Sequence, residues 1–279
     1  MEVVLLKKNK LKNYIGIVQG RLSKKVNNQI QAFPKNWSNE FKLINKIGYD
    51  GIELIYDNYK NPFLSKSYQN KLTLLSEKYS VKLMSLSCDF SMHNPLFEKN
   101  RLNTINIIKK LIDACVFLKI PRIGLSFEDK SSIRNEKNLQ LAVNSLKMLS
   151  NYIKNKKIII TLETDLNVNN ILNLLKQLNT KKIKINFDLG NTCAEGNDPL
   201  DYLKKIKAYI YSIHIKDRNV LFGKTVALGK GDVDFSKCLN YLFKNYFHGD
   251  IIIQGARGKD DYKTAKKYFK FIRNIIDKN

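Results

Sequence analysis

The chain has 279 residues, of which 43% are hydrophobic and 10% aromatic, and its formal net charge is +24. This composition indicates a folded protein and excludes a disordered chain, and no apolar run approaches the ~20 residues of a membrane-spanning helix. An α/β barrel commonly reaches ~200–250 residues as one domain. We therefore expect a single domain over residues 1–279 and no membrane partner.

Short β-forming runs alternate with segments of helical period along the chain. Apolar residues recur at i, i+3, i+4 and i+7 in 102–118, in 139–153 and in the closing segment 262–272. Ser38 and Pro199 are expected helix starts, and Gly48 is an expected helix stop. The expected strands are 15–19, 51–56, 81–87, 122–126, 158–163, 183–188, 209–215 and 251–254.

This alternation of eight strands with helices favours a parallel sheet, and eight is the number that closes a (β/α)8 TIM barrel. A doubly wound open sheet is the alternative. Its phosphate-binding fingerprints are missing, because no GxGxxG follows the first strand and GxxxxGK[ST] occurs nowhere. We therefore expect an α/β fold with an eight-stranded closed parallel sheet.

Polar side chains lie at or near the same end of the last four expected strands, namely Glu163, Asp188, His214 and Gln254. Barrel active sites form at the carboxyl ends of the strands, where neighbouring strands can bring such groups together. A single acid at a strand end is usually a loop residue or a helix cap, and a lone histidine is usually a core residue. All four on consecutive strands favour one site for a divalent cation such as Mn²⁺, Mg²⁺, Co²⁺ or Zn²⁺.

Further polar residues fall in the expected strand-end loops. Arg21, Lys216 and Arg257 are candidates for binding a phosphate or carboxylate group of a substrate, with solvated surface charge as the alternative. Glu53 ends the second strand, where it would bond substrate hydroxyls or support other site residues. His93 follows the third strand and is a candidate proton shuttle, with a hydrogen-bonded loop histidine as the equal alternative.

The strong positive charge would suit a nucleic-acid partner. The lysines are scattered, however, and the abundance of Lys, Asn and Ile is typical of an AT-rich genome, so we expect no specific nucleic acid. The N-terminal MEVVLLKKNK places its charges after a short apolar run, which is the reverse of a secretory signal. The four cysteines of the chain form no CxxC pair. We expect a cytoplasmic protein, with a homo-oligomer left open.

Several motifs together resemble a known family: GYDGIEL at the second strand, LET at the fifth, FDLGN at the sixth, HIKD at the seventh and LGKGDVDF after it. The chain is similar to the sugar phosphate isomerase/epimerase family with a xylose-isomerase-like TIM barrel. That superfamily also holds inosose dehydratase and endonuclease IV. The pieces IGIVQGRLS and IIIQGAR resemble a bacterial subgroup associated with surface-polysaccharide genes.

The resemblance implies that Glu163, Asp188 and His214 are metal ligands. The family's fourth ligand is a glutamate on the last strand, where this chain has Gln254. The family's epimerases use the glutamates of the fifth and eighth strands to move a proton between two faces of the substrate. Glutamine offers a carbonyl oxygen to a metal but cannot act as a base. Asn191 stands where the family often has a histidine.

From these residues we expect a metal-dependent isomerase of a small sugar or sugar derivative, with phosphorylated or otherwise anionic sugars among the candidates. Glu163 would be the base that gives an enediolate, with Gln254 orienting the metal or a substrate hydroxyl. An inosose-dehydratase-like lyase and a non-catalytic sugar-binding barrel are the alternatives. An endonuclease IV-like repair enzyme is disfavoured, because its trinuclear zinc site needs many histidines and this chain has three.

Overall fold

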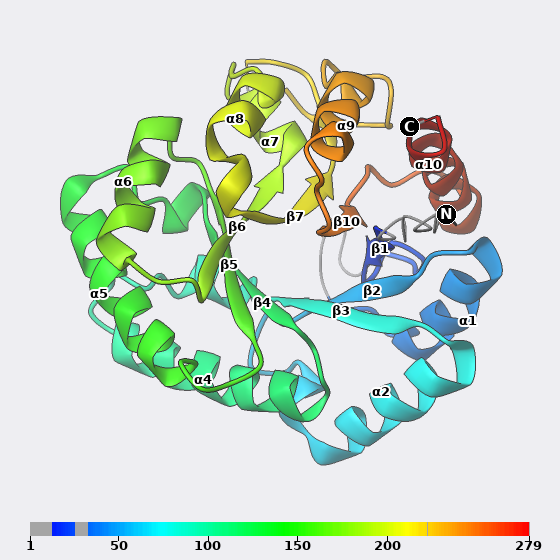
Figure 1. The fold of residues 1–279 in the computed structure, drawn as a ribbon. Coiled ribbons are helices and arrows are strands. Elements are labelled where there is room, and N and C mark those ends of the chain that lie inside the picture. The colour runs from blue at the N-terminus through cyan, green and yellow to red at the C-terminus, as the bar shows by residue number, and fades with distance from the viewer. Residues whose placement is uncertain (1–12, 26–32, 222, 279) are drawn as a thin grey trace, which may run out of the picture.

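The computed structural model describes residues 13–25, 33–221 and 223–278. Its strands form a closed parallel barrel in the order β1-β10-β7-β6-β5-β4-β3-β2, at the centre of the molecule (Figure 1). This confirms the expected (β/α)8 architecture. The barrel strands are β1 Ile15–Val18, β2 Gly51–Ile55, β3 Lys82–Ser87, β4 Arg122–Phe127, β5 Ile159–Thr164, β6 Ile183–Asp188, β7 Ile210–Ile215 and β10 Asp250–Ile253.

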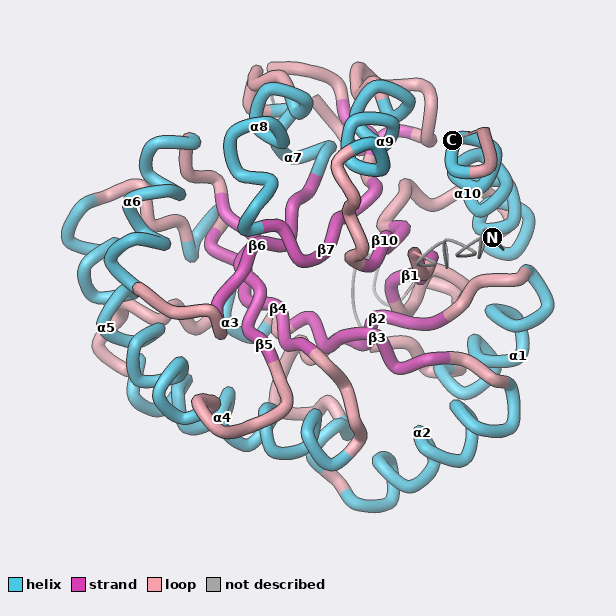
Figure 2. Tube along the Cα trace, in the orientation of Figure 1, coloured by secondary structure: helices cyan, strands magenta, loops and turns pink. Residues whose placement is uncertain are grey.

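The helices surround the barrel as an outer ring (Figure 2). Their apolar stripes face the strands, which is why the helical periodicity is visible in the sequence. The helices are α1 Trp37–Ile47, α2 Lys66–Tyr79, α3 Phe90–His93, α4 Arg101–Phe117, α5 Glu136–Tyr152, α6 Val168–Leu178, α7 Leu189–Ala194, α8 Pro199–Ile206, α9 Phe235–Lys244 and α10 Asp261–Ile276, with 3-10 turns η1 Pro62–Leu64, η2 Asp129–Ser131 and η3 Lys207–Tyr209.

Two of the three expected helix boundaries agree with the structure. Gly48 ends α1 with φ 104°, a left-handed conformation that glycine adopts without strain. Pro199 begins α8, and the side chain of Asp198 accepts a hydrogen bond from the backbone N–H of Leu200. The prediction for Ser38 is wrong, since α1 begins at Trp37 and Ser38 lies within its first turn.

The main hydrophobic core lies between the barrel and its helices, whereas the barrel interior is largely polar. A small apolar cluster of Val18, Ile55, Met84 and Ile252 lies apart from the main core. Met84 comes so close to β1 that a Cβ at Gly16 would lie 2.5 Å from its sulfur. A barrel interior is usually filled by branched apolar residues. Here buried polar side chains of several strands take that place instead.

A short antiparallel hairpin follows β7 and consists of β8 Asp217–Arg218 and β9 Thr225–Val226. Asp217 is fully buried and fixes the loop after the hairpin. Its Oδ2 accepts hydrogen bonds from the backbone N–H groups of Gly229, Lys230 and Gly231 at 2.8–3.1 Å. Asp217, which directly follows Lys216, therefore holds the LGKGD stretch in place.

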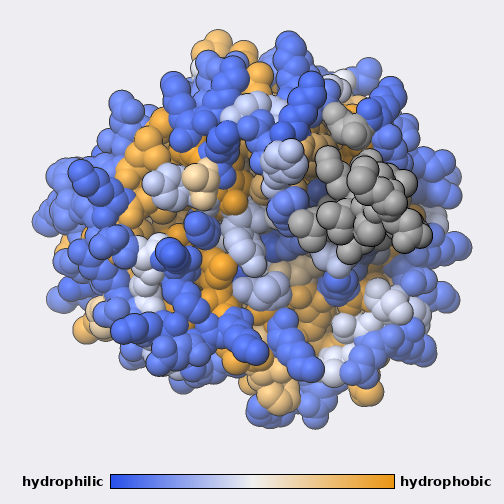
Figure 3. Space-filling view, in the orientation of Figure 1, coloured by the Kyte–Doolittle hydropathy of each residue, from blue (hydrophilic) through white to orange (hydrophobic). Residues whose placement is uncertain are grey.

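The visible surface is mainly hydrophilic at its periphery, with apolar residues showing between the polar ones (Figure 3). Among the described residues, no helix is long and apolar enough to cross a membrane. The four cysteines are buried free thiols.

Candidate active site

Strands β5, β6 and β7 bring Glu163, Asp188 and His214 together, as the sequence predicts. One ligand atom of each residue lies within 4.8 Å of the others, and all three side chains are buried. The sheet register explains the placement, because Asp188 pairs directly with His214 across β6 and β7. Glu163 occupies the penultimate position of the neighbouring strand β5.

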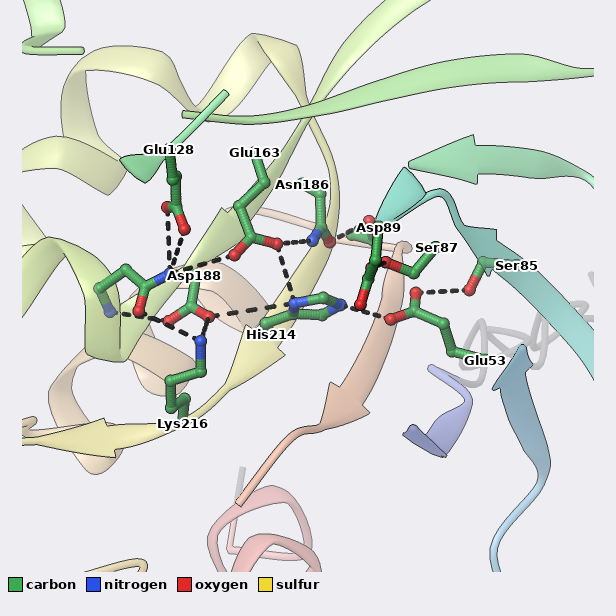
Figure 4. A network of polar contacts seen from close by, with 12 residues as sticks. Glu53, Ser85, Ser87, Asp89, Glu128, Glu163, Asn186, Asp188, His214 and Lys216 are labelled. Atoms are coloured by element: carbon green, nitrogen blue, oxygen red, sulfur yellow. Dashed lines mark hydrogen bonds and ion pairs between the residues drawn. The ribbon is translucent and has the colours of Figure 1, made fainter. Parts of the chain in front are cut away.

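The imidazole of His214 lies between carboxylates from opposite sides of the barrel (Figure 4). Its Nε2 is 2.8 Å from Oε1 of Glu53, and its Nδ1 is 3.0 Å from Oε2 of Glu163. Burial alone would lower the pKa of His214, but the two carboxylates raise it to about 10. In the absence of a metal, Glu53 and Glu163 therefore favour the charged form of His214.

Residues of β3 and β4 hold Glu53 in position. Its Oε2 accepts a hydrogen bond from Ser85 Oγ at 2.6 Å and lies 3.5 Å from the guanidinium of Arg122. Arg122 is itself buried and is also paired with Asp250 at the start of β10. Burial would raise the pKa of Glu53, but His214 and Arg122 lower it to about 2. Glu53 is therefore a fixed anion beneath the imidazole.

Glu163 is oriented by amide groups as well as by the imidazole. Asn186 Nδ2 donates to its Oε2 at 3.0 Å, and Asn191 Nδ2 donates to its Oε1 at 3.1 Å. Burial would raise the pKa of Glu163, but His214 and Lys216 lower it overall. Glu163 is therefore an ionised carboxylate with both oxygens in defined positions.

Asn191, in the first turn of α7, connects the remaining charged groups. Its Nδ2 donates to both carboxylate oxygens of Glu128, at 3.0 and 2.9 Å, and its Oδ1 accepts from Lys216 Nζ at 3.1 Å. Lys216 Nζ also lies 2.9 Å from Oδ2 of Asp188. Burial, followed by the nearby Glu163, raises the pKa of Glu128 well above its usual range.

These groups open into a cavity of about 600 Å³ at the carboxyl ends of the strands. Gln254, directly after β10, lies on its wall, and the Gln254 N–H donates to Ile215 O at 2.9 Å. Gln254 thus shares the cavity with Glu163 and His214. The other described lining residues are Ser87, Asp89, Met92, Ser126, Glu128, Asp129, Ser132, Arg134, Asp165, Asn191, Glu195, Lys216, Arg218 and Thr225.

Five sequence candidates are not among the residues that line this cavity, namely Arg21, Glu53, His93, Asp188 and Arg257. Glu53 and Asp188 lie beside the imidazole of His214 instead. Arg21 is buried and its Nε donates to Gly255 O at 3.2 Å, and Arg257 donates to Ser23 O at 2.7 Å. These contacts join the loops after β1 and β10. His93 ends α3 with an exposed side chain. Their proposed roles toward a substrate stay predictions.

Sequence reasoning missed several residues of the site. Glu128 follows β4 as the other acids follow their strands, so the same strand-end pattern could have identified it. Arg218 comes directly after HIKD and lies on the cavity wall. Arg122 and Asn186 gave no local signal, because an inward-facing polar residue within a strand is recognised only when its partners on other strands are known.

The donor groups are suited to a divalent cation. Glu163 and Asp188 offer oxygen atoms, and Nδ1 of His214 faces both of them, 4.0 Å from Oδ2 of Asp188. A metal-binding histidine usually donates its other ring N–H to a carboxylate, which fixes the ring. The contact between Nε2 and Glu53 has this form. The residues present therefore fit a metal such as Mn²⁺, Mg²⁺, Co²⁺ or Zn²⁺.

The chain is similar to several known proteins. The family model described as "Xylose isomerase-like TIM barrel" matches residues 41–275. L-ribulose-5-phosphate 3-epimerase UlaE of Escherichia coli strain SMS-3-5 is 23% identical over 232 residues, which cover 78% of this chain and 81% of that protein. This relative supports the expectation of an isomerase- or epimerase-like enzyme.

Solved structures confirm the fold. A xylose isomerase domain protein from Planctomyces limnophilus superimposes with a TM-score of 0.78 at 17% identity, covering 95% of this chain and 98% of that one. The apo form of 3-keto-D-glucoside 4-epimerase, YcjR, from E. coli has a TM-score of 0.74 at 17% identity, covering 94% and 100%.

Proposed function

The chain belongs to the family of xylose isomerase-like TIM barrels, and from this premise we propose that it is a metal-dependent isomerase of a small sugar or sugar derivative. One observation carries the proposal. The ligand atoms of Glu163, Asp188 and His214 lie within 4.8 Å of one another at the cavity, and Glu53 holds the other ring nitrogen of His214. Gln254 is the proposed fourth, neutral ligand.

A divalent cation held by these groups would polarise a substrate carbonyl and acidify the C–H bond beside it. Glu163 takes this proton, because its carboxylate is ionised and lines the cavity. Loss of the proton gives an enediolate of the sugar. Glu163 then returns the proton to the neighbouring carbon on the same face, while the substrate's hydroxyl proton passes to the former carbonyl oxygen. Together the two transfers exchange the positions of carbonyl and hydroxyl.

Other residues of the chain keep Glu163 and the ligands in position. Asn186 fixes one oxygen of Glu163, and Asn191 fixes the other. Lys216 lies beside Asp188 and on the cavity wall, where its ammonium group can also reach a substrate oxygen. Positioned groups of this kind lower the barrier because they need no reorganisation during the reaction.

Gln254 favours isomerisation over epimerisation. A two-base epimerisation needs a second base on the opposite face of the substrate, and an amide cannot accept the proton. A single base is sufficient when the proton is removed and returned on one face. Gln254 would therefore orient the metal or a substrate hydroxyl.

The test is solvent deuterium incorporation. The protein is stripped with a chelator, reloaded with Mn²⁺, Mg²⁺, Co²⁺ or Zn²⁺, and incubated in D₂O with a panel of aldoses and ketoses. We expect deuterium at one carbon together with the isomerised sugar, and no reaction without metal. Loss of water from the sugar would favour the inosose-dehydratase-like lyase instead. Binding without exchange would favour a non-catalytic barrel.

A further inference from the structure

The cavity differs in charge from the protein that contains it. The whole chain carries a net charge of +24, which would attract anions at long range. Among the described residues, however, the cavity wall has more carboxyl groups than basic side chains. The carboxyl groups are Asp89, Glu128, Asp129, Glu163, Asp165 and Glu195. The basic ones are Arg134, Lys216 and Arg218, together with the imidazole of His214.

Each basic group on the wall already has partners within the protein. Arg134 lies 3.4 Å from Oδ2 of Asp165 and 2.8 Å from Oε1 of Glu195. Lys216 is bound by Asp188 at 2.9 Å, and Arg218 Nη1 donates to Asn191 Oδ1 at 3.0 Å. A phosphate group would compete with these contacts for the same side chains.

Asp165 and Glu195, the outer carboxyl groups of the wall, in contrast have too few cationic partners. Asp165 and Glu195 share the half-exposed Arg134, and Oδ1 of Asp165 is buried without a hydrogen-bond partner among the described residues. Burial raises the pKa of Glu195 to about 7. A divalent cation would be bound by Glu163 and Asp188, so it would not neutralise this outer group.

We infer that the substrate of this site carries no phosphate or carboxylate group and is an uncharged sugar, whose hydroxyls donate to Glu128, Asp165 and Glu195. This inference rests on the proposed function and narrows its substrate class. It reverses the expectation that Lys216 binds an anionic substituent.

The experiment compares each sugar with its own phosphate ester. The metal-loaded enzyme is assayed by deuterium exchange on D-fructose, D-ribulose and L-ribulose, and on fructose 6-phosphate and the two ribulose 5-phosphates. We expect kcat/KM for a free sugar to exceed that for its ester by at least ~10-fold, since like charges repel strongly in a partly desolvated cavity. An ester that reacts faster than its free sugar overturns the inference.

Two variants test whether charge is the cause. Asp165→Asn/Glu195→Gln should reduce the preference for the free sugar at least ~3-fold at pH 8. Glu77→Gln is the matched control, because Glu77 is exposed and lines a separate pocket with Asp250. The control should keep the full preference. An unchanged preference in the double variant contradicts the inference.

If none of the sugars or esters exchanges deuterium, the proposed function fails for this panel, and a second measurement still decides the inference. Crystals of the protein are soaked in sodium selenate, a dianion with the shape of a phosphate group, and its anomalous signal is mapped. We expect selenate at basic surface sites and none in the cavity. Selenate bound in the cavity overturns the inference.

Discussion

Glu53 and Glu163 both contact the imidazole of His214, yet they belong to two different regions of the site. The β2–β4 side, formed by Glu53, Ser85 and Arg122, is deeply buried, and the oxygens of Glu53 contact His214, Ser85 and Arg122. The β5–β7 side, formed by Glu163, Asp188 and Lys216, contributes Glu163 and Lys216 to the cavity wall. The same side chain can therefore serve as a support or as a reactive group, depending on what surrounds it.

The difference also appears in the charges. The pKa of Glu53 is lowered to about 2 and that of Glu163 is lowered too, although burial opposes both shifts. Glu53 has a guanidinium and a serine hydroxyl on the side away from His214. Glu163 instead has two amide donors, Asn186 and Asn191, and lies close to Asp188. Glu163 also lines the cavity, where a substrate proton can reach it, whereas Glu53 is not among the lining residues.

The largest expected effect is on the β5–β7 side. Glu163→Gln keeps the shape and an oxygen donor but removes the base, so turnover should fall ~10²–10⁴-fold, with any lost metal affinity in addition. Steady-state kinetics at saturating metal measures this, with metal content determined on the same sample. Near-normal turnover with metal bound would falsify the role of Glu163.

The second prediction concerns the β2–β4 side of the site. Glu53→Gln removes the carboxylate that fixes the ring of His214, and we expect metal affinity to fall ~10–100-fold, as for other supporting carboxylates. Competition with a fluorescent chelator measures the affinity. Ser85→Ala removes only one hydrogen bond to Glu53 and should have a smaller effect. A larger loss in Ser85→Ala than in Glu53→Gln would mean that the ring is fixed in another way.

Acid stability distinguishes the two sides further. The folded pKa of Glu53 is about 2, below its ordinary value near 4.5, so its contribution to stability is present above pH 4.5 and is lost as the pH falls toward 2. The free energy of unfolding of the metal-free protein should drop by on the order of 2 kcal/mol over this range because of Glu53 alone. Urea unfolding at pH 5, 4 and 3 should show a flatter pH dependence in Glu53→Gln. Parallel curves would contradict the assignment.

The smallest expected effect concerns Gln254, on the cavity wall. Gln254→Glu supplies a carboxylate for a hard cation, and we expect metal affinity to rise several-fold. A second base would also be present, so some epimerised product should appear beside the isomer. Product stereochemistry by NMR checks this. Weaker metal binding in this variant would exclude position 254 from the ligands.

The fold was largely predictable from the sequence, because strand and helix periodicity are local. The eight strands were placed within one or two residues, and the helix stop at Gly48 was correct. The error at Ser38 has a local cause too, since a serine inside the first turn carries the same signal as one before it. Glu163, Asp188 and His214 were found because each ends or nearly ends an apolar strand.

The tertiary structure decided how those residues are paired. Arg122 and Glu53 are 69 positions apart, and Glu53 and His214 are 161 apart, so no spacing in the chain indicates their contacts. The same holds for Asn191, whose amide reaches Glu128, Glu163 and Lys216. The sequence by itself determined which strands carry polar ends, because burial of an apolar face leaves a periodic pattern. Only closure of the barrel decided which charges neutralise one another and which remain for a substrate, since electrostatic pairing depends on distance in space.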